Sequence, residues 1–322
     1  MKRFFNSMVF AMLILFILCQ TVCAARLLIP GGQLIGISLS DNTVTVAAFE
    51  PTAGDAAKSA GLRIGDQILK INETNVTSLQ DVRDALTRCD GNVQLLIRRG
   101  DQQKTLQMTA AATANGPRLG IGLKEGVTGV GTVTYYDPQS KQFGALGHSV
   151  NNSAGQPVQM EAGTVFHAGV MSIRRGCVGE PGQLMGTLSD KTPIGKISKN
   201  THQGIFGTLT EPISGEKLPA AEKGQVHTGA AVIRSTVADG GVQEYSVEIL
   251  KIYPNPKCAS RNMLLCITDP KLLETTGGIV QGMSGSPIIQ DGKLVGAVTH
   301  VLVNDPTTGY GIFIENMLDA AA

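Results

Sequence analysis

The sequence has no tryptophan, and aromatic residues make up only 4% of its 322 residues. Net charge is also small, because 27 basic residues are balanced by 26 acidic ones. That balance gives no reason to expect a nucleic acid or a strongly acidic partner. Hydrophobic residues reach 42%, so a sizeable core must be built mainly from Val, Ile, Leu and Ala. The 39 glycines exceed the usual share of about 7% and indicate a turn-rich chain made mainly of β-strands.

Beyond the N-terminus, the sequence has no apolar run long enough to cross a membrane. Lys2 and Arg3 precede an apolar run over residues 8–18, and small residues follow near Ala24. This order is typical of an export signal. We therefore expect residues 1–25 to be a signal peptide or a transient membrane anchor, and the rest of the protein to be exported.

Cysteine is scarce, and two of the six cysteines lie in the expected leader. Cys258 and Cys266 are near enough in sequence to bridge a loop, although a domain of this size does not need a disulfide. The sequence contains no Cys-x-x-Cys pair and no His/Cys cluster with zinc spacing. We therefore expect neither a metal site nor a cofactor.

One serine lies in a setting that favours catalysis. Gly282 stands two positions before Ser284, and Gly285 follows it, in a G-x-S-G-x-P pattern that ends at Pro287. Small neighbours let a peptide carbonyl approach the hydroxyl. They also free the backbone amides of Gly282 and Ser284 to form an oxyanion hole. The pattern predicts a nucleophile, although such clusters are also ordinary turns.

His148 is the best candidate for the base that would activate this hydroxyl. It follows a strand pattern that ends at Gly147, and it precedes the serine in sequence, as the base does in chymotrypsin-like enzymes. The imidazole also needs an orienting carboxylate. Asp190, Asp239 and Asp269 lie between the histidine and the serine. Asp269 follows a buried-strand pattern, but spacing alone leaves the choice open.

The other histidines have weaker support. His300 lies on the return strand of a hairpin with the turn Asp291-Gly292. There it is either a pocket residue or, more commonly, a core or surface histidine. Three more histidines have no supporting context: His167, His202 and His227.

Residues 31–110 form a unit of a different kind. A short Ala-rich helix ends at Gly61, and Ser78 with Asp81 makes a capping box for a helix over residues 79–89. The stretch A-G-L-R-I-G-D-x-I-L-K-I-N resembles the PDZ family, whose members bind an extended peptide as an added strand beside a helix. The resemblance implies a carboxylate-binding loop at Gly32, Gln33, Leu34, Ile35 and Gly36.

A small-residue linker over residues 111–117 is followed by short strands and glycine turns. Regular strands of this kind predict a closed β architecture. The expected fold is therefore mainly β: a small α+β PDZ domain at 31–110, followed by a chymotrypsin-like β-barrel serine peptidase domain at 118–322.

The segments 144–148, 267–270, 277–290, 296–301 and 304–311 resemble those of the sporulation stage IV B peptidases, PDZ-containing serine peptidases of endospore-forming bacteria. This resemblance implies that His148 is the base, Ser284 the nucleophile and Asp269 the orienting carboxylate. The sequence departs from the family pattern at Ser149, where glycine is expected. The stretch between the leader and the PDZ segment is also very short.

Members of that family are exported from the forespore into the space between its two membranes. They cleave themselves and then cut a membrane-bound regulator, which leads to activation of the late sigma factor. The resemblance implies the same localisation here, protein and peptide substrates that include the chain itself and such a regulator, and membrane contact through the N-terminal segment. Two alternatives are a catalytically inert PDZ protein that tethers its partners and a general quality-control protease.

Overall fold

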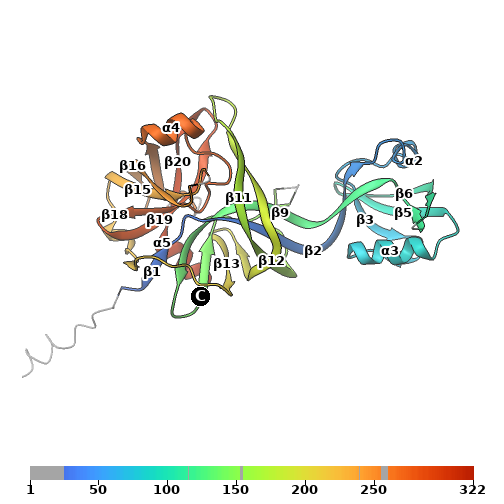
Figure 1. Cartoon of the computed structure of the whole chain (residues 1–322), viewed down its shortest axis with the longest axis horizontal. Coiled ribbons are helices and arrows are strands. Elements are labelled where there is room, and N and C mark those ends of the chain that lie inside the picture. The colour runs from blue at the N-terminus through green and yellow to red at the C-terminus, as the bar shows by residue number, and fades with distance from the viewer. Residues whose placement is uncertain (1–24, 115, 153–154, 239, 255–259) are drawn as a thin grey trace, which may run out of the picture.

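The structure is a computed structural model that describes residues 25–114, 116–152, 155–238, 240–254 and 260–322, without the side chains of residues 189–191. The described chain is mainly β, which confirms the predicted fold class (Figure 1). The predicted leader, Asp239 and Cys258 lie outside the described residues. Within them, no helix is long and apolar enough to span a membrane, and Cys89, Cys177 and Cys266 are free thiols.

The strands are β1 (Leu27–Pro30), β2 (Leu34–Phe49), β3 (Gln67–Ile71), β4 (Thr74–Asn75), β5 (Asn92–Arg99), β6 (Gln102–Thr109), β7 (Ala111–Thr113), β8 (Gly116–Arg118), β9 (Ile121–Asp137), β10 (Gln142–Ala145), β11 (Ala162–Arg174), β12 (Gln183–Thr201), β13 (Gly204–Leu209), β14 (Leu218–Pro219), β15 (Gly229–Ser235), β16 (Gln243–Ile252), β17 (Met263–Ile267), β18 (Pro287–Gln290), β19 (Lys293–Leu302) and β20 (Asp305–Phe313). The helices are α2 (Asp55–Ser59), α3 (Leu79–Thr87), α4 (Pro270–Thr276) and α5 (Ile314–Ala321), with a short 3₁₀ helix, η1 (Lys223–Gln225).

A first barrel is closed by antiparallel pairing in the order β2, β9, β10, β13, β12, β11 and back to β2. Its interior holds alternate residues of these strands, among them Ile35, Val133 and Phe143, because side chains of a strand point to opposite faces in turn. β1 extends this sheet by pairing with β9. Just before β1, Arg26 makes a 2.6 Å ion pair with the buried carboxylate of Asp137.

A second barrel is closed by β15, β16, β17, β20, β19 and β18. Its core contains Ile233, Leu265 and Val298. The hairpin of β18 and β19 turns at Asp291 and Gly292, both with positive φ, as the Asp-Gly pair predicts. The chain ends in α5, whose buried residues pack beside both barrels.

The PDZ unit is inserted into the first barrel. β2 leaves the barrel as one long strand, and β9 returns as another, so that the two form a ribbon between the barrels and the PDZ unit (Figure 1). The unit has its own core, which begins at Val44 and ends at Leu119. The helix expected over residues 79–89 is α3, with the predicted capping box of Ser78 and Asp81 in place.

This insertion corrects two predicted boundaries. Residues 27–39, part of which we assigned to the PDZ domain, belong to the first barrel, because Ile35, Ile37 and Leu39 lie in the barrel core. The residues expected to form a linker at 111–117 include the two short paired strands β7 and β8. The chain therefore enters the peptidase fold, leaves it for the PDZ unit and returns.

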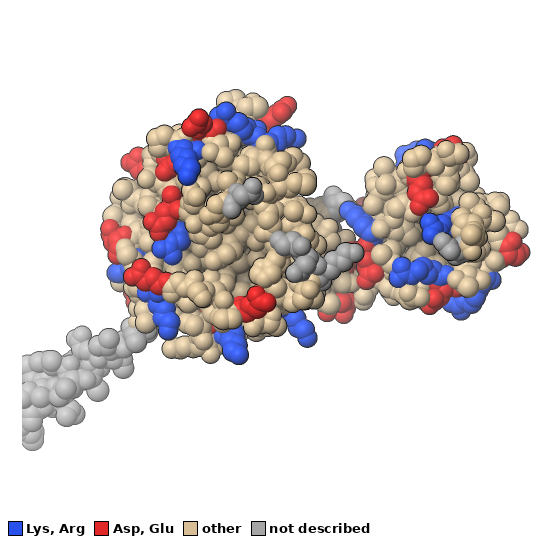
Figure 2. Space-filling view, in the orientation of Figure 1, with Lys and Arg blue, Asp and Glu red and all other residues tan. Residues whose placement is uncertain are grey.

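Basic and acidic side chains are interspersed over the barrels and the PDZ unit on the face shown in Figure 2. No large area of one sign is visible on this face. This face agrees with the balanced composition and provides no strong field for a highly charged ligand.

Candidate active site

The serine-bearing loop joins α4 to β18. Gly282 and Gly285 on either side of Ser284 have φ of 103° and 98°, a region that side-chain-bearing residues rarely adopt. At Gly285 a Cβ atom would lie 2.0 Å from the carbonyl oxygen of Thr132. Glycine is therefore required there, because the loop lies directly against the first barrel.

The base-bearing turn comes from the first barrel and contacts the second. Leu146 and Gly147 both have left-handed φ, 69° and 70°, and such strain is typical of functional turns. At Gly147 a Cβ atom would lie 2.7 Å from Cγ2 of Thr299 on β19. This close approach sets His148 at the junction of the two barrels.

His148 and Ser284 line the same cleft, which has a volume of about 670 Å³. The Nδ1 atom of His148 lies 2.9 Å from the carbonyl oxygen of Ser149. Because a carbonyl only accepts, Nδ1 carries the proton and Nε2 has a free lone pair. Burial lowers the pKa of His148, so the ring is neutral near pH 7, as a general base must be.

The Ser284 hydroxyl donates a 2.8 Å hydrogen bond to the carbonyl of Thr299 rather than to His148. The hydroxyl must therefore leave the Thr299 carbonyl before its proton can pass to the imidazole. Catalytic hydrogen bonds often form only once substrate is bound. The structure therefore brings nucleophile and base to one cleft but holds the hydroxyl on another acceptor.

Asp269 occupies a different place from the one expected of an orienting carboxylate. It does end a buried strand, as predicted, but its side chain caps helix α4. Oδ1 accepts from the amide of Leu272 at 3.0 Å, and Oδ2 accepts from the amide of Ser246 at 3.4 Å. The structure does not bring it into the cleft of His148 and Ser284. Asp239 and the Asp190 side chain lie outside the described residues.

No carboxylate belongs to the described side chains that line this cleft. Among the described residues, the polar group that holds the His148 ring is the Ser149 carbonyl. It selects the tautomer but carries no full charge. Ser149 is also the position at which the resemblance led us to expect glycine.

The two amides expected to form an oxyanion hole are available. Within the described part of the chain, the N–H groups of Gly282 and Ser284 donate to no protein acceptor. Their carbonyls, in contrast, are held by Thr132 of β9: its hydroxyl donates to Gly282 O at 2.8 Å, and its amide donates to Ser284 O at 3.0 Å. The buried Thr134 hydroxyl likewise donates to Gly285 O at 2.8 Å. Neither threonine was predicted from the sequence, although their alternation on one face of β9 was a signal.

His300 is the other residue whose place the sequence left open. It lines the cleft, and its ring centroid lies 5.3 Å from that of His148. Burial, the neighbouring His148 and Arg261 lower its pKa to about 4. The pocket interpretation therefore holds for His300.

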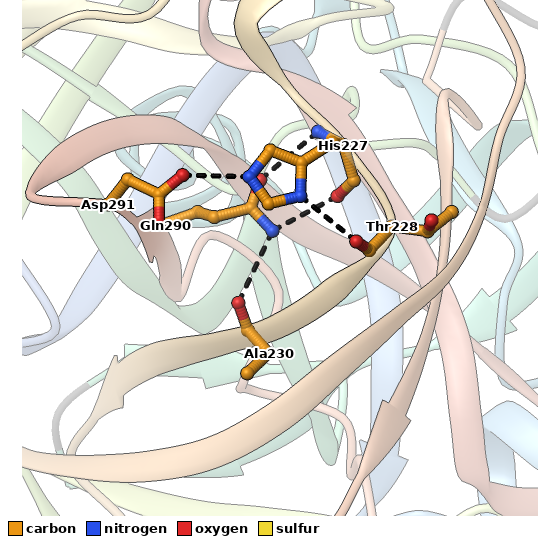
Figure 3. A network of polar contacts seen from close by, with 5 residues as sticks. All are labelled: His227, Thr228, Ala230, Gln290 and Asp291. Carbon is orange, nitrogen blue, oxygen red and sulfur yellow. Dashed lines mark hydrogen bonds and ion pairs between the residues drawn. The ribbon is translucent and has the colours of Figure 1, made fainter.

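His227 lies elsewhere, on the second barrel, in a surface network (Figure 3). Its Nδ1 faces the carbonyl of Thr228 at 2.9 Å, and its Nε2 faces the carboxylate of Asp291 at 2.7 Å. Both ring nitrogens meet acceptors, so these contacts raise the pKa of His227. It contributes nothing to the cleft.

The predicted carboxylate-binding loop of the PDZ unit is wrong. Gly32, Gln33, Leu34, Ile35 and Gly36 lie in the first barrel at the start of β2. Leu34 pairs with Thr132, while Ile35 pairs with Gly131 on one side and His167 on the other. A strand paired on both edges cannot accept a peptide as a further strand.

The edge suited to such a peptide lies on β9 instead. Residues 121–125 of β9 pair with β2 on one side, and their other edge has no strand partner in the described chain. Helix α3 lies beside this edge, and the amide of Leu79 at its first turn donates to Oε2 of Glu125 at 3.1 Å. A free strand edge next to a helix is the arrangement that PDZ domains use for peptide binding.

Two closed β-barrels, with a neutral imidazole from the first and a glycine-flanked serine from the second at one cleft, define the class of chymotrypsin-like serine peptidases. Comparison with protein families agrees. The model of the SpoIVB peptidase S55 family matches residues 115–318, and that of the PDZ domain matches residues 33–109. The chain belongs to the SpoIVB peptidase S55 family.

Other similarities are partial. A putative zinc metalloprotease of Nostoc sp. is 31% identical over 113 residues, which cover 33% of this chain and 31% of that protein. The chain thus spans less than a third of that relative. Among solved structures, the active form of the Rv3671c protease of M. tuberculosis is 16% identical, with a TM-score of 0.36 over 60% of this chain and 72% of that one. An inactive serine-to-alanine mutant of the same protease is also 16% identical, with a TM-score of 0.34 over 60% of this chain and 81% of that one. These TM-scores are too low to support any detail of the site.

Proposed function

We propose that this protein is a serine endopeptidase of sporulation signalling. In this proposal it is exported to the forespore intermembrane space, cleaves itself and cuts a membrane-bound regulator, which leads to activation of the late sigma factor. The observation that carries the enzymatic part is the shared cleft of His148 and Ser284. The signalling part rests on family membership.

The chemistry follows from the tautomer of His148. Ser284 Oγ attacks the substrate carbonyl carbon while its proton passes to Nε2 of His148, and the amides of Gly282 and Ser284 bind the resulting oxyanion. Collapse of this intermediate breaks the C–N bond, and His148 gives the proton to the departing amine. A water molecule, deprotonated by the same imidazole, then hydrolyses the acyl-enzyme and regenerates the Ser284 hydroxyl.

The PDZ unit would bind a peptide tail of the chain itself or of its partner along the free edge of β9.

The barrel begins soon after the expected leader, since Arg26 is held by Asp137 and Leu27 starts β1. Self-cleavage that preserves activity is therefore expected before Arg26 or within the PDZ unit.

The test compares two serines of the same loop. Ser284→Ala should abolish self-cleavage and labelling by a fluorophosphonate probe, while Ser286→Ala should keep both. Ser286 is a matched control because its buried hydroxyl donates to Ser235 at 3.1 Å, away from the cleft. Circular dichroism and thermal melting verify that both variants fold.

An inert tethering protein is the second candidate, and one observation favours it: the Ser284 hydroxyl is bound to Thr299 O and not to the base. This candidate gains if the folded wild-type protein is neither labelled nor self-cleaved. Broad cleavage of unfolded proteins would instead identify a quality-control protease.

A further inference from the structure

Two histidines from different barrels meet at the active-site cleft. His148 follows β10 of the first barrel, and His300 lies on β19 of the second. Their ring centroids are 5.3 Å apart, and the ring planes are inclined by 44°. Both rings line the cleft that contains Ser284 and also an adjoining cavity of about 420 Å³. The peptidase mechanism uses only His148, so His300 has no role in it.

Both imidazoles are suited to bind a metal ion at neutral pH. A neutral imidazole has one unprotonated ring nitrogen, which is the atom that binds a metal ion, and both rings line the same cleft. His148 donates through Nδ1 to a backbone carbonyl, the outer contact that metal-binding histidines usually make. The Nδ1 atom of His300 is buried and has no hydrogen-bond partner among the described residues.

The spacing of the rings fits a single zinc ion. Zinc binds imidazole nitrogen at about 2.0–2.1 Å in tetrahedral geometry. With each nitrogen roughly 1 Å in front of its ring centroid, two imidazoles on one zinc have centroids about 5 Å apart. The observed separation of 5.3 Å agrees with this value.

We propose that His148 and His300 together form a zinc-binding site that inhibits the peptidase. Zinc would occupy the Nε2 lone pair that otherwise takes the proton of Ser284, so metal and substrate turnover exclude each other. The remaining positions suit water or the Ser284 hydroxyl. His202, on the exposed turn between β12 and β13, also lines the adjoining cavity, but it is not grouped with the two rings as a metal ligand.

The site would be reversible rather than structural. In the described part of the chain, no group of three or more His, Cys, Asp or Glu residues is arranged to hold a metal. Only two histidines therefore bind the ion, and the Arg261 charge that acts on His300 opposes a cation. A reversible inhibitor must dissociate, so moderate zinc affinity is sufficient.

A zinc titration of the full chain tests the site without relying on turnover. The background is Ser284→Ala, which prevents self-cleavage, and zinc chloride competes with a chromophoric zinc chelator at pH 7.5. We expect one zinc per chain. His148→Gln and His300→Gln should each weaken binding at least tenfold, since even changes to outer-shell partners of a metal site cost about 10–100-fold.

His227→Gln and His167→Gln are matched controls on exposed histidines that pair with Asp291 and Glu211. Neither should change the affinity, and circular dichroism reports the fold of every variant. Unchanged zinc affinity in folded His300→Gln, or its loss in His227→Gln, would overturn the site.

Inhibition itself rests on the proposed function and has its own measurement. In the chain with Ser284 intact, zinc should slow fluorophosphonate labelling, and a chelator should restore it. A chain that binds zinc through both histidines but never reacts with the probe would refute the peptidase and leave the metal site standing. Labelling that is insensitive to saturating zinc would refute the inhibition.

Discussion

At the scale of single residues, the histidine is fixed by a neutral group. The Ser149 carbonyl holds Nδ1 of His148, while the carboxylate of Asp269 accepts from the amide of Leu272 in α4 and from that of Ser246 on β16. A carbonyl can set the tautomer, but it stabilises an imidazolium less than a carboxylate does. Asp269 has two possible roles. As a helix cap it needs only an acceptor oxygen, whereas as an orienting group for His148 it needs a carboxylate.

Asp269→Asn and Asp269→Ala separate these roles. A helix cap tolerates asparagine, whereas alanine should lower the free energy of unfolding by about 1 kcal/mol. If capping is the role, both folded variants keep their rate of fluorophosphonate labelling. If the carboxylate orients His148, both lose roughly 10⁴-fold in turnover, as replacement of a triad aspartate does.

Acid should destabilise the protein through its cleft histidines. The pKa values of His148 and His300 lie below 6.5 in the fold, at about 4 for His300. An unfolded chain therefore takes up protons that the native chain does not, and stability present above pH 6.5 is lost as the pH falls toward 4. Melting temperatures between pH 7 and 4.5 should fall less steeply in His300→Gln than in wild type.

His227→Gln is expected to act in the opposite direction. The pKa of His227 is raised by Thr228 and Asp291. The contribution of His227 to the free energy of unfolding is therefore present below pH 6.5 and is lost as the pH rises. The melting temperature of His227→Gln should therefore fall more steeply than that of wild type as the pH is lowered from 7 to 4.5. A pH profile identical in all three proteins would contradict both assignments.

At the scale of elements, β9 connects the two functional parts of the chain. Its first residues provide the free edge beside α3, and further along the same strand Thr132 holds the serine loop. The carbonyl of Thr132 also accepts from the amide of Leu146 at 3.3 Å, just before His148. One residue thus contacts both the nucleophile loop and the base-bearing turn.

Thr132→Val should slow acylation about tenfold, because a buried hydrogen bond lost at Gly282 costs roughly 1–3 kcal/mol. Thr132→Ser keeps the hydroxyl and should retain most of the rate. Thr128→Val, on an exposed position of the same strand, should change nothing. Rates of acyl-enzyme formation measure all three, and equal rates for Thr132→Val and wild type would remove the positioning role.

The elements also show what the sequence could predict. The serine loop, the helix cap at Ser78 and the Asp291-Gly292 hairpin depend on neighbours in sequence, and glycine and cap chemistry identify them locally. Thr132 and His300 gain their roles from barrel closure, which brings distant strands together. The stretch Leu34 to Gly36 was wrongly predicted to bind peptide because a barrel strand and a peptide-binding strand share the same alternation of apolar residues.

At the scale of the whole molecule, the PDZ unit and the barrels have separate cores joined by the ribbon of β2 and β9. Leu39 pairs with Val127 at the end of the first barrel. Beyond this pair, the barrel core receives no further residue of β2. The barrels should therefore fold without the inserted unit.

Replacing residues 41–125 by Asn-Gly tests this expectation. A two-residue turn of this type suits the twist of an antiparallel pair, and Ser40 and Gly126 would flank it. The shortened protein should fold cooperatively and react with a fluorophosphonate at Ser284. An insoluble or molten product would show that the barrels depend on the PDZ unit.

The double connection of the PDZ unit also determines what a single cut can do. A module attached by one linker leaves the enzyme when that linker is severed. Here a nick anywhere between β2 and β9 leaves each fragment fastened by its own barrel strand. A single cut can thus open the PDZ unit without detaching it, and its release into solution requires a second cut.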